Sequence, residues 1–408
     1  MPTVSTVLAG VRGALRGPLA ALRQHDDLVV RTQVRIAELP APTGMEAERG
    51  RLVNRWFRRA GLHQVHTDEA GNVLALRPAF RSANASPGTS ALAPVVVLAH
   101  LDTVFPAGTP CIVRRDAGRL TGPGIGDNGR GLAAMLAIAA ALADPALPLG
   151  RPLLFVATTG EEGHGDLRGA RHLFSTLPRP PAAAIVLDGP GDSAIVHQAV
   201  GSRRFRVHFS GPGGHSWTSA GAANPIHAAA RATTTIANSA AYRGAHPSLT
   251  LAVTRTGGGL SVNAIPESAW LDVDVRALTT TALDAGERVV REAVAAAVAA
   301  ENGSRAAWSE PCTARVVGTG SRPAGVVSSS DPLVRLAAAA TRMVHRAPVL
   351  TAASTDANVP ISLGIPAVAI GAGGTGGGTH TVDEWFENTH GALGIERAVM
   401  VVAGMAQR

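Results

Sequence analysis

Hydrophobic positions in the first part of the chain follow a helical period and then shorten into strand-like runs. A helical period through residues 28–37 stops at two prolines, and a second helix is expected at 45–60. A strand is expected at 72–76, followed by a loop rich in Ser, Ala and Pro between Arg81 and Pro94. The chain therefore begins as a mixture of helices and short strands.

Four short, continuously apolar runs follow that loop. They span residues 95–99, 153–157, 183–187 and 367–370. Runs of this length, without alternating polar positions, are typical of strands that are buried on both faces of a mostly parallel sheet. We therefore predict an α/β domain with a three-layer αβα arrangement.

From about residue 201 the pattern changes to alternating strands and amphipathic helices. We expect strands at 205–209, 249–254, 269–275 and 314–317, and helices at 225–239 and 282–300. This βαββαβ order is that of a split βαβ sandwich. The prediction is thus a discontinuous first domain, residues 1–200 and 318–408, with a two-layer βαββαβ domain inserted as residues 201–317. A helix at 332–345 resumes the first domain.

The composition excludes several kinds of chemistry. All 37 basic residues are Arg, so the chain has no lysine for a Schiff base, a phosphate-binding loop or a Ser-Lys pair. The formal charge is +7, but the arginines are dispersed, and the densest group, residues 51–59, has the spacing of a solvated helix face. Only 3% of the residues are aromatic, which argues against base stacking. We therefore expect no nucleic-acid partner.

The two cysteines bear on the compartment. Cys111 and Cys312 lie far apart and match no metal or redox spacing, so two free thiols in a reducing compartment are expected. Gly and Arg interrupt the apolar stretches of the first residues, so we expect no signal peptide and no membrane span. A cytoplasmic location follows as a prediction.

Each apolar run leads into candidate chemistry. The polar residues that follow the four runs are, in chain order, His100 and Asp102, Glu161 and Glu162, Asp188, and His380. Ligands of open α/β sheets bind beyond the carboxyl ends of the strands, so these side chains should converge at one edge. Asp127, in a Gly-rich turn before an apolar helix, is expected to join them.

Imidazole and carboxylate groups in this number fit a pair of divalent cations. We expect one site from His100, Asp188 and one oxygen of Asp127, beside a second site from Glu162, His380 and the other oxygen of Asp127. The ligand types favour Zn²⁺, with Co²⁺ or Mn²⁺ as substitutes.

Two neighbours of these residues have predicted supporting roles. Asp102 should accept the free N–H of the His100 ring and fix its tautomer. Glu161 should face away from Glu162 and serve as general base, which passes a proton from water to the leaving amine. A carboxylate that bridges two metal ions often requires strained backbone geometry. We therefore expect a strained peptide bond after Asp127, and a cis peptide bond is one form that this strain can take.

These segments resemble the five signature segments of metallopeptidase family 20, the co-catalytic zinc hydrolases that include aminoacylase, acetylornithine deacetylase, succinyl-diaminopimelate desuccinylase, carboxypeptidase G and peptidase T. The matching segments are residues 99–104, 126–128, 159–163, 187–189 and 378–380. The resemblance runs from about residue 30 to 405. It implies a phosphorylase/hydrolase-like catalytic domain that binds two metal ions, with the inserted domain acting as a lid and forming a homodimer.

The resemblance also implies roles for residues outside the metal cluster. His215, in Gly-Gly-His, matches a histidine that polarises the substrate carbonyl, often across the dimer, and Asn263 matches a substrate-contacting asparagine. Arg276 matches an arginine that often binds a substrate carboxylate, although a charge at the end of a strand explains it equally well. Asp356 lies in a Ser-Thr-Asp-Ala-Asn segment that resembles peptidase T, and it is expected to contact substrate.

Two positions bear on how closely the chain follows the family. One departs from the common family residue, and the other distinguishes two branches of the family. Gly129 stands where relatives commonly have Lys, two residues after the bridging Asp127. Asp rather than Glu at position 188 accompanies aminopeptidases and dipeptidases in the family, whereas Glu accompanies carboxypeptidases and deacylases. Together with the segment around Asp356, this favours the peptidase-T-like branch.

The leading hypothesis is a zinc-dependent metallopeptidase that cleaves a small peptide as an aminopeptidase, dipeptidase or tripeptidase, with a metal-bridging hydroxide as nucleophile and Glu161 as general base. An N-acyl-amino-acid deacylase or carboxypeptidase of the same family is the alternative. From another class, a peptide-binding protein that has lost its metals stays open. The substrate is accordingly a small peptide or an N-acyl amino acid.

Overall fold

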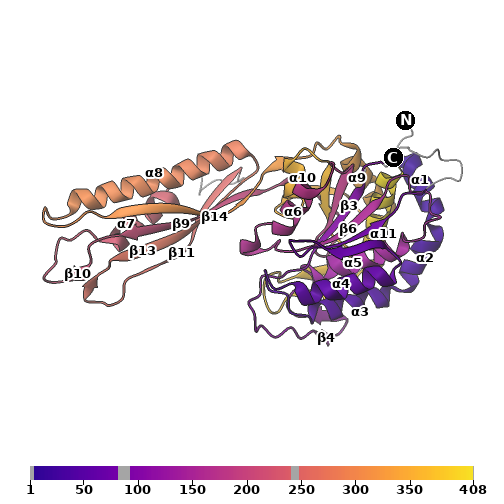
Figure 1. Ribbon diagram of the computed structural model, residues 1–408, viewed down its shortest axis with the longest axis horizontal. Helices are drawn as coiled ribbons and strands as arrows, with labels where there is room; N and C mark the ends of the chain where they lie inside the picture. Colours follow the sequence, from indigo (N-terminus) through magenta and orange to yellow (C-terminus); the bar gives the residue numbers. More distant parts are fainter. Residues whose placement is uncertain (1–3, 81–91, 240–247, 408) are drawn as a thin grey trace. The chain divides into compact units, whose positions relative to one another are not determined.

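The computed structural model describes residues 4–80, 92–239 and 248–407 (Figure 1). The expected Ser-, Ala- and Pro-rich loop falls mostly on residues 81–91, outside the described part. The chain divides into two compact units, unit 1 (Met1–Ala199 with Val326–Arg408) and unit 2 (Val200–Gly325). The boundary expected after residue 317 lies after Gly325, because strand β14 (Thr313–Arg322) continues along its partner past that residue.

Unit 1 is built on a nine-stranded mixed sheet with the order β1-β2-β6-β3-β7-β17-β8-β15, and β16 pairs with β8. The four apolar runs form its centre as β6 (Leu153–Thr158), β3 (Val95–His100), β7 (Ala183–Leu187) and β17 (Ala367–Ile370). These strands pair in parallel. Almost all of their side chains are buried although successive ones point to opposite faces, so both faces of the sheet are covered. The predicted parallel core is confirmed.

The outer strands of this sheet are less apolar, and several were not expected. They are β1 (His63–Thr67), β2 (Val73–Arg77), β8 (Ala194–Ala199), β15 (Gly325–Val326) and β16 (Val349–Ala353). A separate small antiparallel sheet has the order β18-β19-β5-β4. Its strands are β18 (Thr375–Gly377), β19 (Trp385–Glu387), β5 (Arg119–Thr121) and β4 (Arg114–Asp116). The turn between β18 and β19 carries His380.

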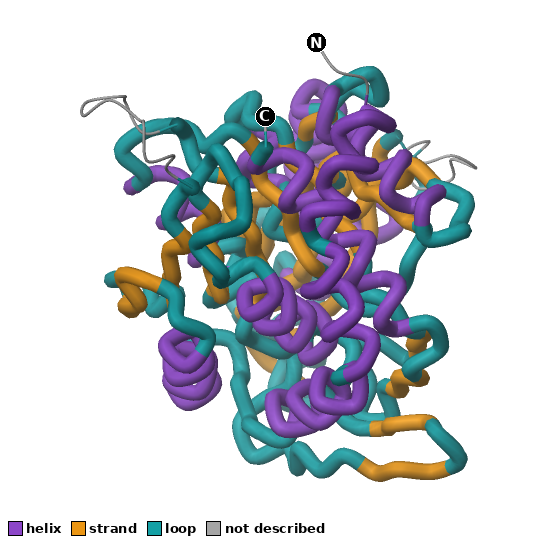
Figure 2. The backbone as a smooth tube through the Cα atoms, turned by 90° about the vertical axis from the view of Figure 1, so that its right-hand side faces the viewer, coloured by secondary structure: helices purple, strands orange, loops and turns teal. Residues whose placement is uncertain are grey.

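The helices of unit 1 lie beside the large sheet (Figure 2). They are α1 (Val4–Ala14), α2 (Arg16–Gln24), α3 (Asp26–Ala37), α4 (Ala47–Arg59), α5 (Gly129–Ala141), the short η1 (Gly163–Gly165), α6 (Arg168–Thr176), α9 (Pro332–Met343), α10 (Asn358–Ser362) and α11 (Gly391–Ala406). The most buried of them, α5 and α11, both contact β3. Among the described residues, no helix combines the length and the apolarity that crossing a membrane requires.

Unit 2 has the predicted βαββαβ order. Its antiparallel sheet runs β11-β13-β9-β14, with β9 (Gly201–Ser210), β11 (Leu249–Gly258) and β13 (Ser268–Ala277) beside β14. Helices α7 (Pro225–Ala237) and α8 (Thr280–Ser304) pack on each other and on the sheet, where they bury Phe205, Val207 and Leu271. Asn224 and Thr279 cap the two helices by accepting backbone N–H bonds. A two-stranded ribbon, β10 (Gly214–His215) with β12 (Ala264–Ile265), completes the unit.

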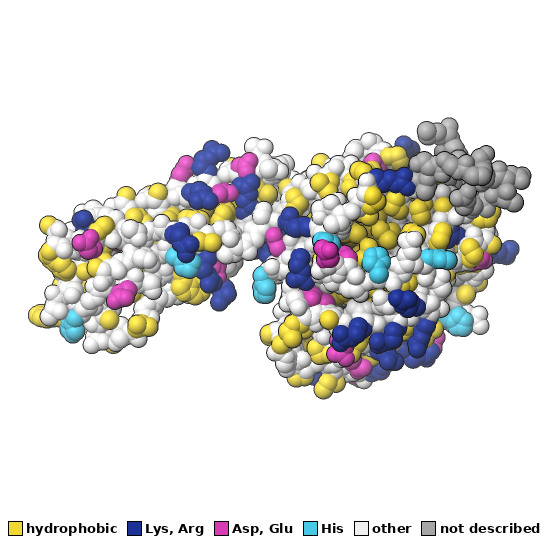
Figure 3. All heavy atoms as spheres, in the orientation of Figure 1, with side chains coloured by type: hydrophobic (Ala, Val, Ile, Leu, Met, Phe, Trp, Pro, Cys, Tyr) yellow, Lys and Arg dark blue, Asp and Glu magenta, His cyan; other side chains and the backbone are white. Residues whose placement is uncertain are grey.

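Arginine side chains gather on the surface of unit 1 over α3 and α4 (Figure 3). In α4 the exposed ones are Arg51, Arg55, Arg58 and Arg59. The opposite side of that helix buries Leu52, Val53 and Phe57 in the core. The group therefore has the solvated, amphipathic arrangement that its spacing predicts.

Candidate metal centre and active site

Five side chains predicted as metal ligands meet at the carboxyl end of the central strands of unit 1. His100 is the last residue of β3, Asp188 directly follows β7, and Glu162 lies just beyond β6. Asp127 precedes α5, and His380 lies in the turn between β18 and β19. The sheet therefore supplies three of the five residues from adjacent parallel strands.

Asp127 lies at the centre of the cluster and faces a different imidazole with each oxygen. Its Oδ1 is 3.0 Å from Nε2 of His100, and its Oδ2 is 3.3 Å from Nε2 of His380. An Asp188 oxygen lies 3.9 Å from the same His100 nitrogen, and a Glu162 oxygen lies 3.2 Å from the His380 nitrogen. The five residues thus form two groups that share Asp127, and these are the groups that the sequence predicts.

The close packing of these groups shifts their pKa values in opposite directions. Burial, followed by the charge of Asp127, raises the pKa of Asp188 to about 7. Hydrogen bonds with Asp127 and Glu162 raise the pKa of His380 to about 10. Burial lowers the pKa of His100, but Asp102 and Asp127 outweigh it, and the net pKa is raised. Conversely, the two imidazoles outweigh burial and lower the pKa of Asp127.

These shifts mean that the cluster stabilises positive charge, which is what a bound cation supplies. The donor atoms are carboxylate oxygens and imidazole nitrogens, the set that suits Zn²⁺, Co²⁺ or Mn²⁺. Donor atoms of His100, Asp127 and Glu162 all lie within 4.8 Å of one another. The residues present therefore fit divalent cations.

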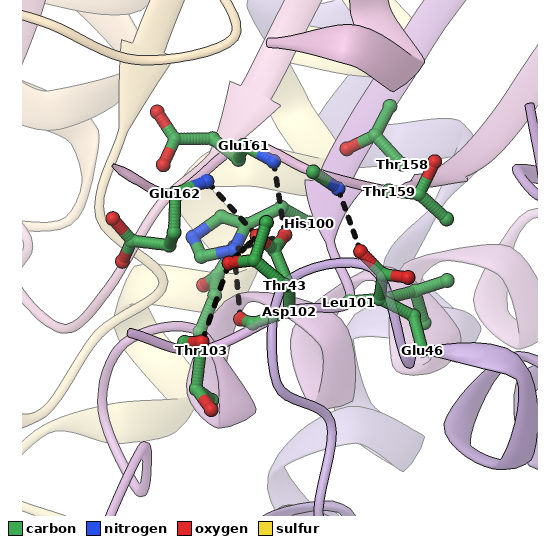
Figure 4. Close-up of polar contacts among 12 residues, drawn as sticks. Thr43, Glu46, His100, Leu101, Asp102, Thr103, Thr158, Thr159, Glu161 and Glu162 are labelled. Atoms are coloured by element: carbon green, nitrogen blue, oxygen red, sulfur yellow. Dashed lines mark hydrogen bonds and ion pairs between the residues drawn. The ribbon is translucent and has the colours of Figure 1, made fainter. Parts of the chain in front are cut away.

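Asp102 connects the His100 ring to the loop that carries Glu161 and Glu162 (Figure 4). Its carboxylate accepts hydrogen bonds from the backbone N–H groups of Glu161 and Glu162, at 3.0 and 2.9 Å, and from the Thr43 hydroxyl at 2.9 Å. The His100 Nδ1 atom lies 3.1 Å from the backbone oxygen of Asp102 and 3.5 Å from its carboxylate. Burial raises the pKa of Asp102, but His100 and the two N–H groups outweigh it, so the pKa is lowered.

Glu161 is buried, and its side chain extends to the same side as that of Glu162 in Figure 4, away from Thr159, so the expectation that it faces away from Glu162 is wrong. The backbone before it is fixed by two buried side chains. Glu46 accepts the N–H of Gly160 at 3.1 Å, and Asn72 accepts the N–H of Thr159 at 3.0 Å. The loop of the predicted base is thus held by Asp102, Glu46 and Asn72 together.

Asn128 is a site residue whose role the sequence analysis missed. The peptide bond between Asp127 and Asn128 is cis, one of the forms expected there. The Asn128 side-chain oxygen accepts from the backbone N–H groups of Gly131 and Gly189, and its amide donates to the Leu187 oxygen at 2.9 Å. It therefore caps α5 and ties this turn to the end of β7, next to Asp188. Its position directly before a helix is a capping signal that could have identified it.

Glu384 is the second residue missed. Its buried carboxylate accepts three backbone N–H bonds, from Gly124, Gly126 and Asp127, at 2.9, 2.9 and 2.7 Å. Burial, with the nearby charge of Asp127, raises its pKa to about 7 against these hydrogen bonds. Because its partners are backbone amides, no spacing of side chains in the sequence signals this role.

Asp356 lies beside the cluster in unit 1. It is 1% exposed, its carboxylate accepts the Thr158 hydroxyl, and its charge contributes to the raised pKa of Asp188. The structure thus places it, buried, next to the predicted metal ligands.

The remaining predicted substrate residues belong to unit 2, where the structure brings two of the three together. His215 is in β10, and the N–H of the following Ser216 donates to the Asn263 backbone oxygen at 2.9 Å. Both side chains are exposed. Arg276 lies near the other end of β13 from Ser268, roughly 25 Å away by strand rise, and its guanidinium contacts Asp274 at 2.7 Å. Arg276 is therefore not part of the His215 and Asn263 group.

Comparison with known proteins places this chain in a family. Residues 96–408 match the model of the peptidase family M20/M25/M40. The chain belongs to this family. The predicted family is confirmed, and membership of a peptidase family supports a hydrolytic enzyme.

The similar proteins include peptidases of several kinds. A probable carboxypeptidase of Aspergillus clavatus is 32% identical over 221 residues, which make up 49% of this chain and 48% of the relative, so the match spans about half of each protein. The fold is similar to that of the aminopeptidase PepT from Bacillus cereus, with TM-score 0.72, 22% identity and coverage of 93% of this chain and 98% of that one. It is also similar to the Bacillus subtilis YXEP protein, described as a dinuclear metal-binding M20 peptidase, with TM-score 0.65, 17% identity and coverage of 93% and 98%.

Proposed function

We propose that this M20 chain is a two-metal hydrolase that cleaves an amide bond in a small peptide from its amino end. The observation that carries the proposal is the position of Asp127, with one oxygen facing His100 and Asp188 and the other facing His380 and Glu162. A shared carboxylate between two imidazole–carboxylate groups is the donor arrangement that a dinuclear site needs. The dinuclear metal-binding description of the Bacillus subtilis protein supports this reading.

The two groups would each hold one divalent ion, Zn²⁺ by ligand type, with Co²⁺ or Mn²⁺ as substitutes. When bound, the ions supply Lewis acidity, which lowers the pKa of an attacking water and polarises the scissile carbonyl. Glu161 takes the proton of that water and returns it to the leaving amine, since its buried loop is fixed by Asp102. Asp102 holds the His100 ring and the Glu161 loop in fixed positions relative to each other.

Residues of unit 2 would complete the site. In this proposal His215 donates a hydrogen bond to the carbonyl oxygen as it gains charge, and the adjacent Asn263 contacts substrate. Arg276 and Asp356 stay candidate substrate residues, with Arg276 for a carboxylate. We further infer a homodimer formed through unit 2, and a cytoplasmic location from the free thiols of Cys111 and Cys312.

A carboxypeptidase or N-acyl-amino-acid deacylase is the second candidate, because the Aspergillus clavatus relative is described as a probable carboxypeptidase. Asp at position 188 supports the aminopeptidase reading over this one. A peptide-binding protein without metal is the candidate from another class, and the complete set of five donor residues argues against it.

The deciding experiment compares three matched substrates on metal-loaded protein: trialanine, acetyl-trialanine and trialanine amide. Mass spectrometry of the products identifies which bond is cleaved. The proposal expects cleavage of trialanine and its amide at the first peptide bond, and no cleavage of the acetylated peptide. Release of the carboxyl-terminal residue from acetyl-trialanine would establish a carboxypeptidase, and release of acetate a deacylase. A metal content below one ion per chain would favour the binding protein.

A further inference from the structure

Glu384 joins two parts of the predicted metal centre that are distant in sequence. Its carboxylate is 2% exposed and accepts the N–H groups of Gly124, Gly126 and Asp127. One oxygen bonds both Gly126 and Asp127, and the other bonds Gly124. The loop that presents the shared carboxylate of Asp127 is therefore wrapped around a single buried carboxyl group.

The same residue closes the turn that carries His380. The N–H of Glu384 donates to the Thr381 oxygen at 3.1 Å, and the N–H of Thr381 donates to the Gly378 oxygen at 3.0 Å. The backbone oxygen of Glu384 also accepts the N–H of Gly122 at 2.8 Å. Glu384 is thus fixed at its backbone to the His380 turn and at its side chain to the Asp127 loop.

The fit leaves little freedom on the loop side. A Cβ atom on Gly126 would lie 2.7 Å from the Glu384 carboxyl group, so any side chain at position 126 would displace that group. Truncation of Glu384 would leave three backbone N–H groups without this acceptor, and an unsatisfied buried N–H group lowers the free energy of unfolding. The contact is therefore a built feature of the loop.

The ligands of the two predicted metal sites are held in different ways. His100 and Asp188 sit at the ends of buried strands β3 and β7, and Asn128 ties the Asp127 turn to the end of β7. His380 lies in an exposed turn at φ 67°, with its side chain 53% exposed. Glu384 ties that turn to the backbone of the Asp127 loop, in addition to the pairing of β19 with β5.

We propose that Glu384 is a positioning residue that sets the metal affinity of one site selectively, the site made by Glu162, His380 and Oδ2 of Asp127. The inference rests on the proposed two-metal function. It assigns Glu384 an effect on one metal site and not on the other, although Glu384 itself contacts no substrate. Residues that orient metal ligands typically account for about 10- to 100-fold in metal affinity. The loss of Glu384 should therefore weaken one ion and leave the other in place.

The test is a Zn²⁺ titration of the metal-free 408-residue chain by calorimetry, in which wild type and Glu384→Gln are compared. Glutamine keeps two of the three acceptor contacts but sets an NH₂ group against one backbone N–H. We expect two ions in wild type, and in the variant one ion of unchanged affinity and one weakened about 10- to 100-fold. At limiting Zn²⁺, kcat should fall with KM within about threefold, and excess Zn²⁺ should restore kcat.

Glu396→Gln is the matched control, because Glu396 is a buried glutamate of α11 that pairs with Arg23 instead of with the metal centre. It should lower the Tm and leave both metal affinities unchanged. Equal weakening of both ions in Glu384→Gln, or no weakening of either, overturns the inference. If Glu384→Gln does not fold, Glu384→Asp is titrated with the same criteria. Failure of wild type to bind two ions would instead overturn the proposed function.

Discussion

At the scale of single residues, Glu161 and Glu162 are adjacent but have different predicted tasks. Glu161→Ala should lower kcat by about 10²- to 10⁴-fold, since it removes the general base. Its zinc content should stay at two ions, because the Glu162 carboxylate beside His380 is untouched. Elemental analysis of the purified variant measures this directly, and Glu162→Ala, which should lose one ion, is the paired control. Loss of metal from Glu161→Ala would show that the two roles are exchanged.

The raised pKa values of the two histidines predict that metal binding releases protons. At pH 7 the metal-free protein holds His380 protonated, because its pKa is raised to about 10, and His100 is raised as well. A metal ion requires the neutral ring, so binding should release at least one proton per chain, and affinity should fall as the pH is lowered. Calorimetry in buffers of different ionisation enthalpy measures the release. A binding enthalpy that is independent of the buffer would contradict the prediction.

At the scale of elements, the sequence predicts the strands that end in metal-ligand candidates, but it does not predict the short strands and turns that position them. The four central strands are continuous apolar runs because both their faces are buried, so the pattern of apolar residues alone predicts them. Strands β4, β5, β18 and β19 are short and partly exposed, and only their mutual pairing makes them strands. His100 could be predicted because it directly follows a recognisable apolar strand. Glu384 could not, because its partners are backbone amides, which every sequence contains.

The start of α5 explains the missing lysine next to Asp127. A Cβ atom on Gly129 would lie 2.7 Å from the Gly124 backbone oxygen, in the loop that wraps Glu384, so this chain has no room for a side chain there. Its helix therefore begins with glycine instead of the Lys that the family resemblance implies.

Gly129→Ala should accordingly destabilise unit 1 by about 1–3 kcal/mol, because overpacking outweighs the roughly 1 kcal/mol by which Ala is favoured over Gly in helices. Urea unfolding of the metal-free protein measures the change. Gly10→Ala in α1 is the control, since no atom outside the local helix backbone lies within 4 Å of a Cβ at that position, and it should stabilise or leave stability unchanged. Equal effects at the two glycines would rule out the steric explanation.

At the scale of the whole molecule, the chemistry is divided between two compact units. The predicted metal ligands, Glu161 and Asp102 belong to unit 1, whereas His215 and Asn263 form a separate exposed group in unit 2. The proposed role of His215 requires that it act at a metal centre, either that of its own chain or that of a second copy. The proposed homodimer favours the second copy, and this alternative can be tested by mixing two inactive proteins.

The variants are Glu161→Ala and His215→Ala, each expected to be inactive with both metals bound. If His215 serves the partner's metal centre, a mixed dimer contains one site with both defects and one site with neither. Equal amounts, allowed to exchange subunits, should then recover about a quarter of wild-type activity, because half of the dimers are mixed and each has one intact site of two. No recovery, with exchange verified by mass spectrometry of the intact dimers, would mean that His215 serves its own chain. A variant pair that cannot complement in either arrangement, Glu161→Ala with Glu162→Ala, sets the background.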